Sequence, residues 1–264
     1  MGNLCSMDAS VPDRRTPMVL CMTENLNPGA TKTDAIAVEG KKCKAIGENI
    51  KGFRRTTSGW SEDGKKVFVF EVFDTAEAML QGMQYVDMPE LQRCLSFDTF
   101  WCQCAQDQFV GEWGDMVKNF GMNAFSIDGV GGLDTDLTPL LDPPSGPMVC
   151  VAIQSPNPGI TQKEMMAVHK KNSDAAATCA GYKRQMGSWN AEGTKCLIVE
   201  IFDKPETYFE WVGKVEMPEV MRCIKMEKVM LQCSSAQLKA FGDMPKNFGM
   251  EIFLTDGTTG HNSM

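Results

Sequence analysis

The sequence predicts an α+β protein in which two β-α-β-β-α-β units of one chain pack sheet against sheet and form a barrel. The first observation is a duplication, because DMPELQRC at 87–94 recurs as EMPEVMRC at 216–223. The second is that apolar runs, helical segments and turns follow the same order in both copies. The third is that the strongest strand, VFVFEVF, is apolar on both faces, so its sheet needs a cover on both sides. The other copy supplies that cover.

The duplication extends over most of the 264 residues. GDMVKNFGM at 114–122 matches GDMPKNFGM at 242–250, and further matches continue back to the first strand of each copy. We therefore expect the two units to cover residues 17–129 and 147–257. The stretch 130–146 between them is rich in proline and small polar residues, which is typical of a linker.

Each unit opens with an apolar strand, an Asn-Pro-Gly turn and a helix. In the first copy the strand is 18–22, and the helix begins at Thr31 and ends at about residue 49. In the second copy the strand is 148–152, and the helix begins at Thr161 and ends at about residue 178. A hairpin follows, because a strand through a tryptophan ends at an Asp-Gly or Glu-Gly turn and a second apolar strand comes next.

The second helix of each unit begins near residue 75 or 205 and is broken by the proline of the repeated phrase. Pro89 and Pro218 cannot continue a helix, but each suits the first turn of a new one. A final strand, 100–104 or 229–233, completes the unit. This order of elements places both helices on one face of a four-stranded antiparallel sheet.

Composition and charge exclude several classes of function. The net charge is −8 at pH 7, so nucleic acid is not an expected partner, because phosphate binding needs clustered lysine and arginine. No apolar run approaches the ~20 residues that span a bilayer. The 11 cysteines include no CxxC pair and the chain has only 2 histidines, so we expect reduced cysteines in the core and no metal site.

The first six residues, MGNLCS, fit the M-G-x-x-x-[ST] pattern for N-myristoylation of Gly2, and Cys5 is placed for palmitoylation. A single myristoyl chain binds a membrane only marginally, and no polybasic patch is present to add a second attraction. We therefore expect residues 1–16 to be a flexible, doubly acylated segment that holds the protein at the cytoplasmic face of a membrane. Residues 258–264 are expected to form a loose tail.

The stretch FEVFDTAEAML at 70–80 and its copy VEIFDKPETYF at 199–209, with the closing segments GMNAFSIDG and GMEIFLTDG, resemble the dimeric α+β barrel superfamily. Within it, the sequence is similar to antibiotic-biosynthesis-monooxygenase-like domains, present here as a tandem pair. The resemblance implies ferredoxin-like units and a cofactor-independent monooxygenase that acts on phenolic or quinol substrates. Haem-degrading enzymes belong to the same superfamily, and many members carry a histidine in the second helix. Neither copy has that histidine, and no cofactor is expected.

Glu71 and Glu200 are the candidate catalytic residues. Each occupies the same position of an otherwise apolar strand, where a buried carboxylate is costly unless it is paired. A carboxyl buried inside the barrel suits a general base that takes a proton from a phenol or a carbon acid. The alternative is a structural carboxylate near a strand end, paired with Arg55 or Arg184 on the neighbouring strand.

Trp60 and Trp189 are candidate ligand-binding residues, together with Arg55 and Arg184. The tryptophans lie on the second strand of each unit, where they can stack on a flat ligand in a cavity. The alternative is ordinary packing in the core or at a covered sheet edge. The 20 methionines suit a soft lining for an apolar ligand and equally suit core filling.

Three functions from different classes are compatible with these features. The first is a membrane-tethered barrel that binds an apolar small molecule, with monooxygenase-like activity on an aromatic substrate as its enzymatic form. The second is a non-catalytic carrier or sensor of a lipid-like ligand. The third is a structural or signalling adaptor that uses the outer surface of the barrel. A catalytic constellation repeated in both halves favours an enzyme, and only the glutamates and tryptophans named above recur in this way. Small-molecule binding ranks first, with monooxygenase-like activity as its form if there is chemistry.

Overall fold

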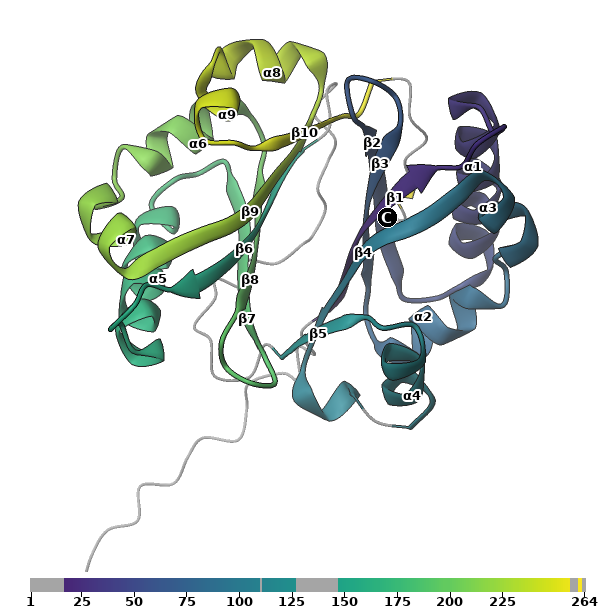
Figure 1. Ribbon diagram of the computed structural model, residues 1–264, viewed down its shortest axis with the longest axis horizontal. Coiled ribbons are helices and arrows are strands. Elements are labelled where there is room, and N and C mark those ends of the chain that lie inside the picture. Colours follow the sequence, from purple (N-terminus) through teal and green to yellow (C-terminus); the bar gives the residue numbers. More distant parts are fainter. Residues whose placement is uncertain (1–16, 110, 127–146, 257–260, 263–264) are drawn as a thin grey trace, which may run out of the picture.

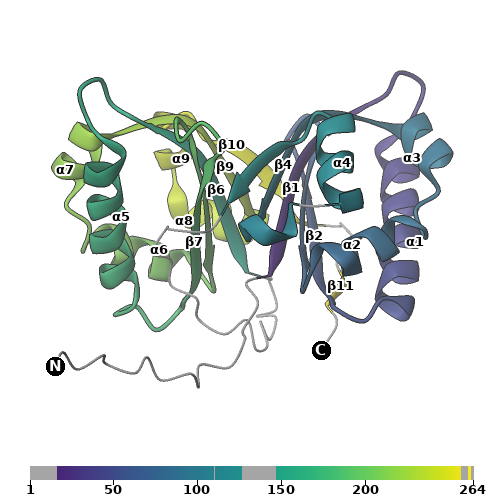
Figure 2. The ribbon, with the colours of Figure 1, turned by 90° about the horizontal axis from the view of Figure 1, so that it is seen from below.

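The computed structural model describes residues 17–109, 111–126, 147–256 and 261–262. Within these ranges the chain forms a mixed α+β fold, in which a closed β-barrel has its helices on the outside (Figures 1 and 2). None of the described helices is long and apolar enough to cross a membrane. The expected linker and the acylation sites Gly2 and Cys5 lie outside the described residues.

The elements of each half follow the predicted order as far as the fourth strand. The first half contains β1 Met18–Leu26, α1 Lys32–Asn49, β2 Phe53–Trp60, β3 Lys66–Phe73, α2 Ala76–Met83, α3 Met88–Cys94, β4 Leu95–Cys104, a 3₁₀ turn at Gln106–Gln108, α4 Gly111–Asn119 and β5 Asn123–Ser126. The second half contains β6 Met148–Pro156, α5 Gln162–Ala176, β7 Tyr182–Asn190, β8 Cys196–Phe202, α6 Pro205–Val212, α7 Met217–Cys223, β9 Ile224–Cys233, α8 Ser235–Phe241, α9 Met244–Asn247, β10 Glu251–Leu254 and β11 His261–Asn262.

The barrel is closed by strands that cross from one half to the other. In the described residues the strand order is β10-β9-β6-β8-β7-β5-β4-β1-β3-β2-β11, and a pairing between β10 and β2 closes the ring. β5 runs parallel to β4 and pairs with β7, while β10 runs parallel to β9 and pairs with β2. The prediction of two four-stranded sheets is therefore wrong, because each half adds a fifth strand. These added strands are 4 residues long, which is too short for a clear alternating pattern in the sequence.

Local sequence explains where the helices begin and break. Thr31 and Thr161 are the N-caps of α1 and α5, and each forms a reciprocal capping box with the acidic residue three positions later. A capping box satisfies backbone N–H groups that have no partner within the helix. Pro89 lies in the first turn of α3, and the carboxylate of Asp87 caps that helix. The second helix is therefore broken between α2 and α3, as predicted.

Apolar side chains cover both faces of the barrel wall. The interior is one cluster to which both halves contribute, including Phe68 and Phe70 of β3 and Val199 of β8. The outer face carries separate clusters beneath the helices of each half. The two-sided apolar pattern of β3 thus has the explanation predicted from the sequence, since one face packs on helices and the other on the opposite half.

Two glutamines connect the halves inside the barrel. Gln103 of the first half donates through Nε2 to the backbone oxygen of Leu197 in the second half, at 3.3 Å. Gln232 of the second half accepts from the Thr57 hydroxyl at 2.6 Å and donates to the backbone oxygen of Phe68 at 3.1 Å. Buried polar groups must be paired to be tolerated, so these contacts fix how the two halves align.

Candidate functional site

The two candidate catalytic glutamates lie on the outer, helix-covered face of the barrel wall. Glu71 is paired across strands with Leu20, which belongs to the core beneath the helices. Arg55 lies opposite the residue after Glu71, and side chains alternate between faces along a strand, so Arg55 points into the barrel. The same register separates Glu200 from Arg184 in the second half. Both arginines are buried on the face opposite to the glutamates.

In the first half, the partner of Glu71 is a lysine from helix α1. Lys42 Nζ lies 3.0 Å from Glu71 Oε1 and 2.9 Å from Glu39 Oε2. The side chains of Lys42, Glu71 and Glu39 are 9%, 7% and 4% exposed. Burial lowers the pKa of a lysine, but the carboxylates of Glu39 and Glu71 outweigh burial and raise the pKa of Lys42 well above its usual value. Lys42 is therefore a cation at neutral pH.

Glu24 of β1 adds another carboxyl to this cluster. The residue is 2% exposed, and its Oε2 has no hydrogen-bond partner among the described residues. Burial, followed by the neighbouring carboxylate of Glu39, raises the pKa of Glu24 to about 8, against the opposing effect of Lys42. Glu24 is therefore mainly protonated at pH 7 and ionises within reach of physiological pH.

A cavity of about 40 Å³ lies beside Glu24, Lys42 and Glu71, between the sheet and helices α1 to α3. The rings of Phe97 and Phe100 line it and stack on each other, with centroids 5.5 Å apart. A water-sized group needs ~10–15 Å³, so the cavity holds roughly three such groups. A larger ligand requires that flexible methionines move. The methionines that line the cavity are Met22, Met79, Met83 and Met88.

The equivalent glutamate of the second half has neutral partners. The Tyr182 hydroxyl donates to Glu200 Oε1 at 2.9 Å, and Gln185 Nε2 donates to the same atom at 3.1 Å. Ser173 in turn donates to Gln185 Oε1. Burial raises the pKa of Glu200 to about 7, and the hydrogen bonds from Tyr182 and Gln185 limit the rise. Glu200 is thus a buried carboxyl held by hydrogen bonds.

The buried polar positions on this face coincide when the two copies are aligned, but only the glutamate is common to both. The other residues change from Glu24, Glu39 and Lys42 in the first half to Gln154, His169 and Asn172 in the second. Burial lowers the pKa of His169 to about 4, so its imidazole is neutral at pH 7. The first half therefore buries charges, whereas the second surrounds one carboxyl with neutral polar groups.

The two predicted tryptophans lie in the cores beneath the helices and do not line this cavity. Trp60 is 2% exposed and Trp189 is 7% exposed. Lys32 Nζ lies 5.4 Å from the centroid of the Trp60 ring, and Trp189 Nε1 lies 3.2 Å from Met166 Sδ. These surroundings match the packing alternative, and ligand binding by the tryptophans stays a prediction.

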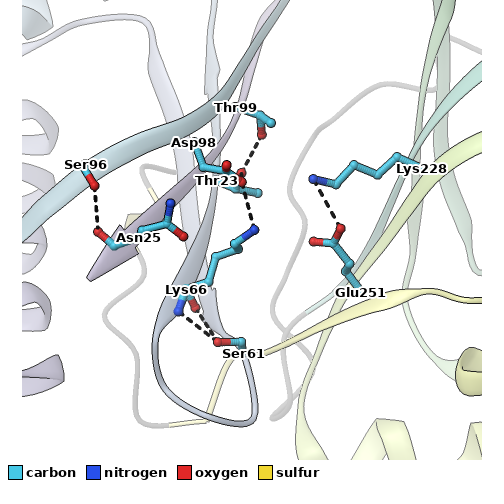
Figure 3. Close-up of polar contacts among 9 residues, drawn as sticks. All are labelled: Thr23, Asn25, Ser61, Lys66, Ser96, Asp98, Thr99, Lys228 and Glu251. Atoms are coloured by element: carbon cyan, nitrogen blue, oxygen red, sulfur yellow. Dashed lines mark hydrogen bonds and ion pairs between the residues drawn. The ribbon is translucent and has the colours of Figure 1, made fainter. Parts of the chain in front are cut away.

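A second group of charged residues lies where strands of the two halves face each other (Figure 3). Lys66 Nζ is 2.9 Å from Asp98 Oδ2, which also accepts a hydrogen bond from the Thr23 hydroxyl at 3.0 Å. Lys228 of the second half pairs with Glu251 at 3.4 Å. Each of these four charges has a partner and is partly exposed, so the group is suited to holding strands together.

Sequence reasoning missed Glu24, Glu39 and Lys42, although the sequence carries a signal for them. Leu20, Met22 and Glu24 alternate along β1, so Glu24 shares the helix-facing side with the apolar residues before it. Glu39 and Lys42 are three positions apart within the buried stripe of α1, where a surface helix normally carries apolar residues. The helix-facing side of β1 and the buried stripe of α1 pack against each other. An ion-pair cluster among the charged residues on these two faces could therefore have been predicted.

The donor set of this region does not suggest a metal. In the described part of the chain, no group of three or more His, Cys, Asp or Glu side chains is placed to hold a metal ion. The described cysteines are free and buried. Burial raises the pKa of Cys43, which follows Lys42 in α1, to about 12, so its thiol is uncharged at neutral pH.

No protein-family profile matches the chain, and no curated protein sequence is similar to it. Solved structures are similar in fold. A candidate monooxygenase from Fusobacterium nucleatum has a TM-score of 0.56 at 7% identity, over 95% of this chain and 99% of that one. A candidate monooxygenase from Lactobacillus acidophilus has a TM-score of 0.50 at 11% identity, over 82% and 91%. A candidate chlorite dismutase has a TM-score of 0.50 at 10% identity, over 81% and 93%.

These similarities concern the fold alone. They confirm the expected likeness in fold to proteins described as monooxygenases, here as a single chain with a closed barrel. At such low identity the neighbours do not indicate which residues act, because one fold hosts many functions.

Proposed function

We propose that the protein binds a small, largely apolar molecule in the first half of the barrel, beside Glu24, Lys42 and Glu71. The observation that carries the proposal is the cavity, where apolar walls meet a buried carboxyl oxygen of Glu24 that has no partner among the described residues. Leaving a buried polar atom unpaired costs roughly 1–3 kcal/mol, and a ligand that bonds to this oxygen recovers that energy. Apolar pockets with a few convergent polar groups are the usual form of small-molecule sites.

The side chains at the cavity are suited to positioning a ligand and moving a proton. Lys42 fixes Glu71 through their ion pair. Glu24 ionises near pH 8, so it can give or take a proton at neutral pH, as a general acid or base must. The enzymatic form of this proposal is a cofactor-independent, monooxygenase-like reaction on an aromatic ligand, with Glu24 exchanging the proton. The fold likeness supports that form by analogy.

The two copies of the repeat differ in a way that fits this proposal. We infer that the chain is a tandem repeat of an antibiotic-biosynthesis-monooxygenase-like, ferredoxin-like unit. The first copy keeps the charged cavity, and the second copy covers the other face of its sheet. The basis for this division is the replacement of Lys42 by Asn172 and of Glu24 by Gln154 in the second copy.

Binding is tested by labelling the methionine methyl groups with ¹³C and titrating the protein with phenol. We expect shifts for the four cavity methionines and none for Met165, which lies beneath the helices of the second half. The Gly82→Leu variant fills the cavity, because a Cβ at Gly82 points between Ile46 and Phe73 at ordinary contact distances of 3.5 Å. This variant should lose the shifts.

The matched control is Gly213→Leu, at the exposed end of helix α6, which should keep them. The proposal is contradicted if the methyl shifts persist in Gly82→Leu. It is also contradicted if no aromatic probe shifts the methyl signals of the cavity methionines.

Oxygen uptake and product mass separate the possible outcomes. An enzyme consumes oxygen with the bound aromatic compound, and the Glu24→Gln variant loses this activity while it still folds. Binding without turnover identifies a carrier or sensor. A first half that admits no apolar probe leaves the adaptor function, which uses only the outer surface.

We also propose that acylation of Gly2 and Cys5 tethers the protein to the cytoplasmic face of a membrane. The proposal rests on the sequence pattern and the need for two lipid signals. The protein with its residues 1–16, expressed in eukaryotic cells with an alkyne-tagged myristate, should carry the label and sediment with membranes. Gly2→Ala should lose both properties, and Cys5→Ser should keep the label but leave the membrane. A Gly2→Ala protein that stays on the membrane contradicts the tether.

A further inference from the structure

The charged cluster of the first half is short of positive charge. Three carboxyls, those of Glu24, Glu39 and Glu71, are buried there with one ammonium group. Lys42 contacts Glu39 and Glu71, which leaves Oε2 of Glu24 without a partner among the described residues. With every group ionised, one cation faces three anions, and the site lacks a second cation beside Glu24.

An aromatic pair lies beside the unpartnered carboxyl. Phe97 of β4 is directly opposite Glu24 in the strand register, so their Cβ atoms are roughly 4.5–5.5 Å apart on the same face. Phe97 is 42% exposed and stacks on Phe100. A cation held by Glu24 therefore lies next to two aromatic rings, which attract cations through their π faces.

We propose that the ligand of this cavity is a primary amine with a flat apolar tail. Its ammonium group bonds to Glu24 inside the cavity, and its tail packs on Phe97 and Phe100 at the rim. The small cavity volume suits an ammonium and its first carbons, with the tail on the exposed ring. This inference rests on the proposed function and adds the chemical class of the ligand. The carboxylates of Glu39 and Glu71 disfavour an anion, and a neutral ligand supplies no cation for Glu24 once it is ionised.

The pH dependence of binding distinguishes an ammonium from a neutral ligand. In the empty site Glu24 keeps its proton up to about pH 8, and the charged groups that face it are Glu39 and Lys42 from α1 and Glu71 from β3. An ammonium needs the carboxylate, so its binding releases that proton and its affinity rises with pH until Glu24 is ionised. A neutral alcohol that accepts a hydrogen bond from protonated Glu24 shows the opposite trend.

The experiment titrates the ¹³C-methionine protein with 2-phenylethylamine, 2-phenylethanol and 3-phenylpropionate at pH 6.5, 7.5 and 8.5. We expect the amine to bind best, with affinity rising roughly 20-fold from pH 6.5 to pH 8.5 for a carboxyl that titrates near pH 8. The amine itself stays charged, because aliphatic amines titrate at about pH 10. The propionate should not move the cavity methyls.

Glu24→Gln is the matching variant, and the second half carries glutamine at the equivalent position, Gln154. This substitution should weaken the binding of 2-phenylethylamine at least tenfold at pH 8.5 and remove its pH dependence. The binding of 2-phenylethanol should stay unchanged. Glu48→Gln, which removes an exposed carboxylate on helix α1, should change nothing. An alcohol that binds as tightly as the amine at pH 8.5, or amine affinity that is flat or falls with pH, overturns the amine inference and leaves the proposed function standing. If no probe shifts the methyl signals of the cavity methionines, both the amine inference and the proposed function are contradicted.

Discussion

Lys42→Met should destabilise the protein strongly at pH 8 and weakly at pH 5. Methionine keeps the length and apolar stem of lysine but removes the cation that pairs with Glu39 and Glu71. The three side chains are at most 9% exposed, so bulk water replaces the lost ammonium poorly. Removing one partner of a buried ion pair costs about 3–5 kcal/mol. Acid reduces the cost, because protonation neutralises the stranded carboxylates.

The assay is thermal unfolding followed by circular dichroism at the two pH values. For a chain of this size, 1 kcal/mol changes the melting temperature by about 2–4 °C, so the loss at pH 8 is about 6–20 °C. The control is Lys44→Met on the same helix, where Lys44 and Glu48 are 3.9 Å apart and 76% and 61% exposed. Such surface pairs contribute little, so its melting temperature should not change measurably. Equal losses at pH 5 and pH 8, or a Lys42→Met protein as stable as the control, refute the reasoning.

Three further substitutions test the buried carboxyls and the cavity. Glu24→Gln should gain stability over the wild type as pH rises from about 5 to about 8, by up to about 1.4 kcal/mol per pH unit, because native Glu24, with a pKa of about 8, holds a proton that the unfolded chain has released. Urea unfolding profiles of the two proteins that stay parallel in pH contradict this. Tyr182→Phe should cost about 1–3 kcal/mol in urea unfolding, more at pH 8 than at pH 6, because its hydrogen bond favours the ionised form of Glu200; a loss independent of pH counts against this assignment. Gly82→Ala should raise the free energy of unfolding by about 0.5–1 kcal/mol, since the added Cβ meets side-chain atoms at no less than 3.5 Å. A lower melting temperature for this variant shows that the cavity has no room for the methyl group.

Much of the fold could be predicted because the signals are local and occur twice. The capping threonines Thr31 and Thr161 and the helix break at Pro89 all lie where the sequence placed them. The fifth strands could not be predicted, because 4 residues of extended chain do not show a period and their partners lie in the other half. The barrel closes only through strand pairing between the two copies, so the pattern within one copy does not show it.

The candidate site could be predicted in part. Glu71 stood out as a charge in an apolar strand, and the structure places it at the cavity. Its partner, Lys42, looks like an ordinary surface lysine, because lysines on helices are usually solvated, and only its place in the buried stripe of α1 distinguishes it. The predicted partner, Arg55, lies on the neighbouring strand, but its register puts it on the other face. That register runs unbroken from the hairpin turn, where Trp60 is opposite Val67, to Arg55 opposite Val72, and the length of the turn that sets it is not resolved by the apolar pattern.

The measurement that tests the central claim most directly is native mass spectrometry of the wild-type protein from its own source, beside Gly82→Leu prepared in the same way. If the first half holds a ligand beside Glu24, the wild type should carry a reproducible small-molecule adduct that Gly82→Leu lacks. A wild type at its unliganded mass that takes up none of the probes, or an adduct that survives in Gly82→Leu, contradicts the claim that this cavity is the functional site.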